Sequence, residues 1–236
     1  AWLAEQGPTG TVINTIGLTA DFRERPFAAV DAHVTLVAQI LRRPGLEGLL
    51  LLSSTRVYGR SADSREGTPL PCLSSDPSDL YNLSKLLGES LVLQDPRPRL
   101  KVVRLSNVVG EAQPASTFLG ALLAEARATG AVRIQQPANT CKDYVALADV
   151  LRLLPRIAEA GEQRLYNLGS GVNTSHAEVA ALLRARGLAV SFAGSAEPAG
   201  PLSPEVPALS IERLALEFTP PARGPWNWPG PHDLES

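Results

Sequence analysis

Tyr81 and Lys85 are the two residues of this chain whose types and spacing most directly suggest chemistry. Residues four positions apart lie on one face of a helix, so the phenol and the ammonium would stand one turn from each other. A cation held beside a tyrosine hydroxyl favours the phenolate, which allows tyrosine to act as an acid or a base near neutral pH. The pair therefore indicates proton transfer of the kind that oxidoreductases use.

The elements that must position this pair alternate between strand and helix along the chain. Runs of apolar, β-branched residues predict strands. Segments with apolar residues at helical spacing, bounded by Pro or Gly, predict helices. The predicted strands are 11–17, 49–52, 101–105, 132–135 and 164–168, and the predicted helices are 27–42, 78–93, 117–129, 147–160 and 175–186. The strands are continuously apolar, which is typical of a mainly parallel sheet with helices on both faces. We expect an α/β, doubly wound fold of the Rossmann type.

Polar residues follow three of the predicted strands at the point where each strand ends. Gly17 follows the first, Ser53 to Thr55 follow the second, and Asn107 follows the third. Ligands of such sheets bind at the carboxyl ends of the strands. Serine and asparagine at strand ends also cap turns, so no single one of these residues decides the matter. Together with Tyr81 and Lys85, they predict an active site at this edge.

Composition excludes several other classes of function. The 236 residues carry a formal net charge of -2, without a run of Lys or Arg, so nothing indicates a nucleic-acid partner. Cys72 and Cys141 and the three histidines show no metal-ligand spacing, and we expect no metal site. No apolar run is long enough for a membrane span and no signal peptide begins the chain, so we expect a cytoplasmic protein. The sequence contains no methionine, and we hypothesise that it is part of a longer protein.

Several motifs in order resemble the extended short-chain dehydrogenase/reductase family, which contains the NAD-dependent sugar-nucleotide epimerases and dehydratases. Residues 53–59 are similar to its Ser-Ser-x-x-Val-Tyr-Gly strand end, and 81–85 to its Tyr-x-x-Ser-Lys helix. Residues 104–110 resemble Arg-x-x-Asn-Val-x-Gly, and 166–171 nearly match Tyr-Asn-x-Gly-x-Gly. Lys142-Asp143-Tyr144-Val145 resembles a further segment, with lysine where arginine is usual.

The resemblance implies a role for each matching residue. Tyr81 would exchange a proton with a sugar hydroxyl, Lys85 would lower the pKa of Tyr81 and bind the nicotinamide ribose, and Ser54 would hydrogen-bond the reacting oxygen. The implied cofactor-binding residues are Gly17, Ser53, Tyr81, Lys85 and Val108. The implied substrate-binding residues are Thr55, Arg56, Asn107, Lys142 and Tyr144. For Arg56 a solvated surface charge is an equal alternative, Lys142 could instead pair with Asp143 or Asp149, and Tyr144 could simply pack.

The glycine-rich turn that holds the cofactor pyrophosphate in this family does not occur in the sequence. The resemblance therefore implies an N-terminally incomplete sheet and leaves NAD and NADP undistinguished. Residues 1–111 with parts of 132–170 would form the nucleotide-binding domain, and 112–131 with 171–236 the substrate-binding lobe. Helices 27–42 and 78–93 would form a homodimer interface in relatives.

We therefore expect an NAD(P)-dependent epimerase or oxidoreductase that acts on a nucleotide-linked sugar. Dehydratases of the family usually carry Asp-Glu directly after the catalytic Ser or Thr, whereas this chain has Thr55 and Arg56. That difference disfavours the elimination of water. The alternatives are a non-catalytic binding or regulatory protein of the same fold and a reductase of a non-sugar carbonyl compound.

Overall fold

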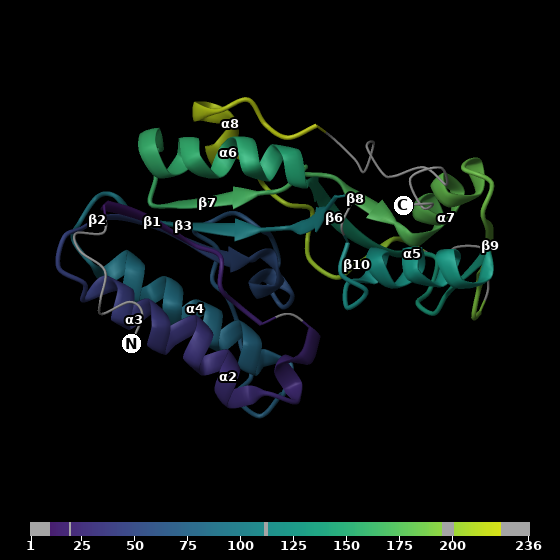
Figure 1. Cartoon of the computed structure of the whole chain (residues 1–236), viewed down its shortest axis with the longest axis horizontal. Coiled ribbons are helices and arrows are strands. Elements are labelled where there is room, and N and C mark those ends of the chain that lie inside the picture. The colour runs from purple at the N-terminus through teal and green to yellow at the C-terminus, as the bar shows by residue number, and fades with distance from the viewer. Residues whose placement is uncertain (1–9, 19, 111–112, 195–200, 223–236) are drawn as a thin grey trace.

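A four-stranded parallel sheet forms the centre of the larger of two lobes (Figure 1). The computed structural model describes residues 10–18, 20–110, 113–194 and 201–222, so both ends of our sequence-based domain division lie outside the described residues. The strands run in the order β1-β2-β3-β7, and each neighbouring pair is parallel. They are β1 (Gly10–Asn14), β2 (Leu46–Ser54), β3 (Leu100–Leu105) and β7 (Leu165–Leu168). The expected parallel α/β sheet is thus confirmed.

Helices cover both faces of this sheet, as the apolar strands require (Figure 1). On one face lie α2 (Pro26–Val30), α3 (Leu36–Leu41) and α4 (Asp79–Gln94). A π-helical turn, η2 (Asp31–Thr35), joins α2 to α3, so the predicted helix 27–42 is one continuous helix with a local widening. Such turns are rare and often occur at functional sites. This one carries His33, which lies beside Lys85 and Tyr81.

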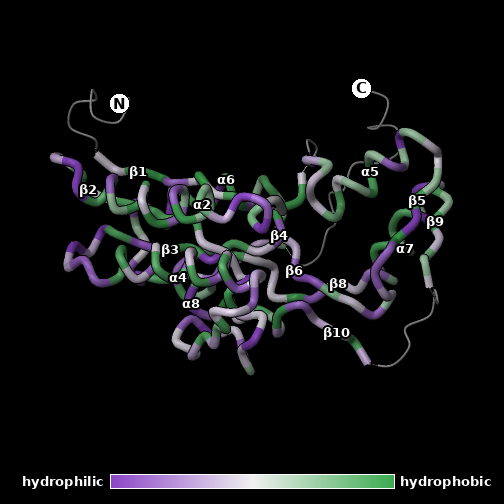
Figure 2. The backbone as a smooth tube through the Cα atoms, turned by 90° about the horizontal axis from the view of Figure 1, so that it is seen from below, coloured by the Kyte–Doolittle hydropathy of each residue, from purple (hydrophilic) through white to green (hydrophobic). Residues whose placement is uncertain are grey.

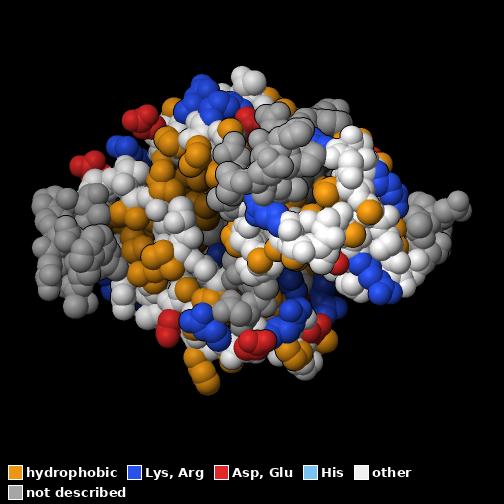
Figure 3. Space-filling model, turned by 45° about the vertical axis from the view of Figure 1, so that its right-hand side comes forward, with side chains coloured by type: hydrophobic (Ala, Val, Ile, Leu, Met, Phe, Trp, Pro, Cys, Tyr) orange, Lys and Arg blue, Asp and Glu red, His pale blue; other side chains and the backbone are white. Residues whose placement is uncertain are grey.

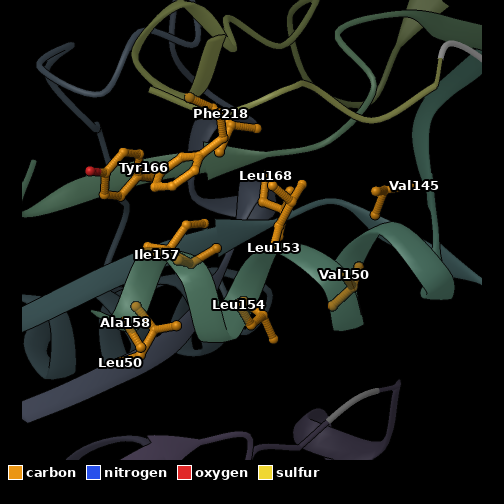
Figure 4. Close-up of a cluster of buried hydrophobic side chains, with 12 residues drawn as sticks. Leu50, Val145, Val150, Leu153, Leu154, Ile157, Ala158, Tyr166, Leu168 and Phe218 are labelled. Carbon is orange, nitrogen blue, oxygen red and sulfur yellow. The ribbon is translucent and has the colours of Figure 1, made fainter. Parts of the chain in front are cut away.

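The other face of the sheet is covered by α6 (Leu147–Ala160) and α8 (Glu212–Glu217). Apolar side chains of α6 face the sheet and meet Leu50, Tyr166 and Phe218 (Figure 4). Each fully buried side chain of this kind contributes about 1.5–3 kcal/mol relative to exposure. Leu214 and Phe218 pack in this core although our sequence-based division places 171–236 in the substrate lobe, because the chain returns to the first lobe after β10.

The second lobe lies beside the first along the long axis of the molecule (Figure 2). Its strand β6 (Thr140–Ala146) pairs in parallel with β4 (Asn107–Val109) and β10 (Ser203–Pro204), and antiparallel with β8 (Asn173–Ser175). The remaining elements are α5 (Phe118–Thr129), β5 (Ala131–Ile134), α7 (His176–Ala185) and β9 (Ala189–Phe192). None of the helices in the described part of the chain has the length and hydrophobicity of a membrane span.

Candidate active site

Ser54 and Tyr81 come together where β2 ends beside the first turns of α4. A short 3-10 helix, η3 (Thr55–Tyr58), turns the chain after β2, and Ser54 Oγ caps it by accepting a hydrogen bond from Arg56 N at 3.2 Å. The Ser54 side chain lies close enough to the Tyr81 hydroxyl to influence its pKa. Burial raises the pKa of Tyr81, while hydrogen bonding with Ser54 and the charge of Arg56 act in the opposite direction. The structure thus places the predicted serine beside the predicted tyrosine.

Lys85 lies one helical turn beyond Tyr81, buried against the end of β2. Its Nζ donates to the backbone oxygen of Leu52 at 3.1 Å and stands 5.9 Å from the centre of the Tyr81 ring. Burial lowers the pKa of Lys85 to about 8, against the opposing charge of Glu89. Our sequence hypothesis gives Lys85 the task of lowering the pKa of Tyr81. In the structure the charge of Arg56 also acts to lower the pKa of Tyr81, and the role of Lys85 stays a prediction.

Gly17 lets the backbone after β1 approach Lys85 closely. A Cβ atom at this position would lie 3.0 Å from Lys85 Nζ and 3.2 Å from His33 Nε2, so a larger residue would crowd the ammonium. Asn14 ends β1, and its Nδ2 is buried without a hydrogen-bond partner among the described residues. A close-packed glycine, a buried ammonium and an unused amide donor at one strand end are compatible with binding of the nicotinamide and ribose of a dinucleotide.

His33 holds the turn after β1 against α4. The backbone N–H of Leu18 donates to His33 Nε2 at 3.1 Å, so Nδ1 carries the ring proton and donates to Ser84 Oγ at 2.9 Å. Ser84 Oγ in turn donates to the backbone oxygen of Tyr81 at 2.9 Å. Burial, with the charge of Lys85 adding to it, lowers the pKa of His33 to about 4 and keeps the ring neutral. The histidine therefore fixes the position of Tyr81 through α4.

A buried polar network supports the ends of β2, β3 and β7. Ser53 Oγ and the Arg104 guanidinium both donate to the Glu89 carboxylate, with Arg104 Nη2 at 2.6 Å from Oε2. Arg104 Nη1 also donates to the Tyr58 hydroxyl at 2.7 Å, and that hydroxyl donates to Asn167 Oδ1 at 2.9 Å. Because Glu89 engages the Ser53 hydroxyl, this side chain supports the strand end.

Asn107 and Val108 follow the next strand, at the start of β4. Asn107 Nδ2 donates to the backbone oxygen of Asp143 at 2.9 Å, while the Asp143 carboxylate accepts from Ser106 and Ser170. Burial raises the pKa of Asp143, and these hydrogen bonds oppose the rise. Val108 is half-buried and packs against the core of the first lobe. Asn107 therefore orients β6 and also borders the cleft.

A cleft leads from Ser54 and Tyr81 to the second lobe. It consists of two adjoining cavities of about 610 and 820 Å³. Both are lined by Arg23, Arg56, Asn107, Lys142 and Glu205. Thr55 is buried in the wall near Ser54. In the space-filling view, basic side chains gather around a hollow near the middle of the face (Figure 3).

Lys142 lies in this cleft, but its ion-pair partner is neither Asp143 nor Asp149, the two candidates from the sequence analysis. Its Nζ lies 3.0 Å from Glu205 Oε1 and 5.2 Å from the Phe118 ring centre. Asp149 pairs instead with Arg152 at 2.6 Å. The reason is topological, because pairing of β10 with β6 brings the distant Glu205 alongside Lys142.

Tyr144 lies in the core of the second lobe and does not line the cleft. Only 2% of it is exposed, and it packs with side chains of α5 and α7. Its hydroxyl has no hydrogen-bond partner among the described residues, and burial raises its pKa. Side chains alternate along a strand, so Tyr144 points to the same side of β6 as Lys142. Lys142 lines the cleft there, whereas Tyr144 packs against apolar side chains of the second lobe. The structure thus favours the packing alternative over the substrate role.

The sequence analysis missed Phe22, Arg23 and Glu205 in the cleft and His33 behind it. Phe22 and Arg23 belong to a 3-10 turn, η1 (Ala20–Arg23), in the loop that follows β1. Their position after a strand end is a usable signal, because loops there surround ligands in such sheets. Glu205 could not be recognised as a cleft residue from the sequence, because the strand that precedes it, β10, has only two residues. Within the described residues, no three His, Cys, Asp or Glu side chains form a group that could bind a metal.

Solved structures with this fold include several enzymes of nucleotide-sugar metabolism. TunA, an NAD-dependent NDP-hexosamine 5,6-dehydratase, is 19% identical with a TM-score of 0.72, covering 88% of this chain and 69% of its own. MoeE5, in complex with UDP-glucuronic acid and NAD, is 22% identical with a TM-score of 0.73 over 94% of this chain and 79% of its own. A UDP-glucuronic acid 4-epimerase from Bacillus cereus is 15% identical with a TM-score of 0.73 over 92% and 74%. At these identities the likeness establishes the fold alone.

Sequence comparison establishes the family. No curated protein matches the chain. The family described as the NAD dependent epimerase/dehydratase family matches residues 3–169, which include β1 to β7 and the residues Ser54, Tyr81 and Lys85. The chain therefore belongs to the NAD dependent epimerase/dehydratase family.

Proposed function

We propose that this chain is an NAD(P)-dependent enzyme that oxidises and reduces a hydroxyl group of a nucleotide-linked sugar at a Ser54-Tyr81-Lys85 site. The observation that carries the proposal is the placement of Ser54 and Tyr81 on the walls of one large cleft at the carboxyl ends of the strands, with Arg56 between the two adjoining cavities. Few arrangements of tyrosine combine a hydroxyl partner, nearby cations and access to a ligand.

Each of the three residues has a task in this reaction. Tyr81 takes the proton of the sugar hydroxyl during oxidation and returns it during reduction. Ser54 hydrogen-bonds the same oxygen while its charge changes. Lys85 has its ammonium close to Gly17, where the backbone carries no side chain, and in our proposal it binds a ribose hydroxyl. Gly17, Lys85 and Val108 would hold a nicotinamide beside this carbon, and that cofactor would supply the hydride chemistry.

Epimerisation or simple oxidation fits the site better than dehydration. Elimination of water requires an acid and a base next to the reacting carbon, and the residues after Ser54 supply neither. Thr55 is buried in the wall of the cleft, and Arg56 is a cation. The names of neighbouring structures, which include complexes with UDP-glucose and UDP-glucuronic acid, support a nucleotide sugar as substrate.

The cofactor and the substrate would lie next to each other at the junction of the two lobes. We assign Gly17, Lys85 and Val108 to the nicotinamide side, with either NAD or NADP, and Arg56, Asn107 and Lys142 to the substrate side. The proposed nucleotide-binding domain is the first lobe, with α8 included, and the proposed substrate lobe begins after residue 112.

The outer face of α2 and α4 carries several exposed apolar side chains. Phe27, Val30, Leu83 and Leu87 are apolar and exposed on these helices, and Phe27 is 86% exposed. Burying such a surface would favour association. We therefore propose a homodimer formed through this face.

Replacing Tyr81 by Phe tests the catalytic assignment. Tyr81→Phe removes the ionisable oxygen and keeps the ring, so turnover should fall roughly 10²–10⁴-fold while binding of NAD(H) or NADP(H) changes little. Fluorescence titration measures cofactor binding, and conversion of UDP sugars measures turnover. Tyr144→Phe is the matched control, because its hydroxyl has no partner among the described residues and lies outside the cleft.

Three results would contradict the proposal in different ways. Tyr81→Phe activity within tenfold of wild type would remove Tyr81 as the acid and base. Cofactor binding with turnover of ketones but not nucleotide sugars would favour a reductase of another carbonyl compound. No saturable binding of either dinucleotide would favour a non-catalytic protein of this fold.

A further inference from the structure

Two arginines stand next to the proposed reaction centre in the cleft. The Arg56 guanidinium carbon lies 5.8 Å from the centre of the Tyr81 ring and 5.1 Å from that of Phe22. Arg23 approaches the same Phe22 ring at 4.6 Å. Phe22 is buried and lies against Tyr81, with ring centres 5.1 Å apart. The aromatic pair therefore holds two positive charges beside Tyr81.

No carboxylate of the described residues pairs with either arginine. Arg23 donates to the Ser78 hydroxyl at 2.9 Å, and the Arg56 guanidinium lies over the two aromatic rings. Two other cations that line the cleft do have carboxylate partners, because Arg60 pairs with Asp79 and Lys142 pairs with Glu205. Both guanidinium groups approach the same Phe22 ring and line the same cleft, so their charges together favour an anionic ligand there.

We propose that Arg56, assisted by Arg23, binds a carboxylate next to the reacting hydroxyl, so that the substrate is a nucleotide-linked uronic acid. This inference rests on the proposed function. A guanidinium binds a carboxylate through two parallel hydrogen bonds, which a neutral hydroxymethyl group cannot offer. In a hexuronate the carboxylate is attached to the carbon adjacent to C4, so an oxidisable C4 hydroxyl at Tyr81 places it near Arg56.

The position of Arg56 separates this role from binding of the diphosphate. Its backbone N–H donates to Ser54 Oγ, so the residue is tied to the reaction centre. The sugar ring lies between a reacting C4 hydroxyl and the diphosphate at C1. Arg133 belongs to β5 of the second lobe and lines only the 820 Å³ cavity, whereas Arg56 lines both cavities, so we assign Arg133 to the nucleotide end. Arg56 thus becomes a specificity-determining residue.

Binding of two matched ligands tests this assignment. Isothermal titration calorimetry of the full chain with NAD present compares UDP-glucuronic acid with UDP-glucose, which differ in one carboxylate. We expect the Kd for UDP-glucuronic acid to be about tenfold lower, the effect of one charge-assisted pair. Arg56→Gln should remove this preference and leave the Kd for UDP-glucose within about twofold. Arg56→Lys, which keeps the charge but loses the fork, should keep part of the preference.

Two comparison variants locate the effect. Arg133→Gln should weaken both ligands by the same factor and preserve their ratio. Arg65→Gln removes an exposed arginine that pairs with Asp63 outside the cleft, and both affinities should stay unchanged. Equal wild-type affinity for the two sugars, or an equal loss for both in Arg56→Gln, would overturn the carboxylate assignment alone. Absence of binding by both UDP sugars would overturn the proposed function and this inference together.

Discussion

Replacing Glu89 by Gln should destabilise the protein strongly, because it leaves a buried arginine without its counter-charge. Glu89 and Arg104 are 2% and 3% exposed, and the Arg104 Nε and Nη2 atoms lie 2.6–3.2 Å from the carboxylate oxygens. Gln keeps the volume of Glu89, but its amide nitrogen carries N–H groups that would face the donors of Arg104 and Ser53. Loss of one partner of such a pair costs about 3–5 kcal/mol. That is a large share of the roughly 5–15 kcal/mol that stabilises a typical domain.

Urea unfolding followed by circular dichroism measures this loss as a lower midpoint at unchanged slope. The double variant Glu89→Met/Arg104→Met removes both charges and should recover much of the stability, giving a coupling energy of about 1–3 kcal/mol. The matched surface control is Glu159→Gln on α6, where the side chain is exposed, and this change should shift the midpoint little. A loss of unfolding free energy below about 1 kcal/mol for Glu89→Gln would refute the reasoning. It would also be refuted if the loss in Glu89→Met/Arg104→Met equalled the sum of the losses in Glu89→Met and Arg104→Met.

Two further predictions concern His33 and the outer face of α4. The pKa of His33 falls from 6.5 to about 4 on folding, so the unfolded chain binds more protons between these values and stability decreases as the pH falls from 6.5 to 4. His33→Gln should reduce this pH dependence of the unfolding free energy without abolishing it, because His176 has a similar pKa of about 4; an unchanged dependence would contradict the buried neutral ring. Leu87→Glu places a charge on the proposed dimer face, where Leu87 is 52% exposed, and should yield monomers in sedimentation equilibrium. A monomeric wild type would argue against that dimer.

The sequence predicts the sheet lobe and the meeting of Ser54 with Tyr81 because both depend on local patterns. Continuous apolar strands and amphipathic helices predict the sheet with its two covered faces, and strand ends meet at one edge. Helical spacing then places Tyr81 and Lys85 on the face of α4 that packs against β2. No long-range information is needed for these steps.

In the second lobe the predicted helices 117–129 and 175–186 and strand 132–135 correspond to α5, α7 and β5. Its other strands could not be predicted in the same way, because most of them are short and pair across long stretches of chain. β4 and β8 have three residues and β10 has two, so none carries a recognisable alternation. β6 contains Lys142 and Asp143, whose charges hide its strand character. Both charges are satisfied by distant groups, Glu205 for Lys142 and Ser170 for Asp143. The pairing of β6 with β4, β8 and β10 also places Tyr144 in the core of the second lobe.

Adjacent residues of one motif have different tasks because β2 alternates its side chains between two directions. Ser53 points to Glu89 and joins the buried network, whereas Ser54 reaches Tyr81 and the cleft. Tyr58 and Arg104 belong to the same network as Ser53, so their presence in family-like motifs reflects support of the strand ends. Arg56 extends from the same turn into the cleft, where we propose that it contributes to substrate selection. A shared motif thus predicts the position of the candidate site, whereas the choice of substrate would depend on side chains outside the buried network.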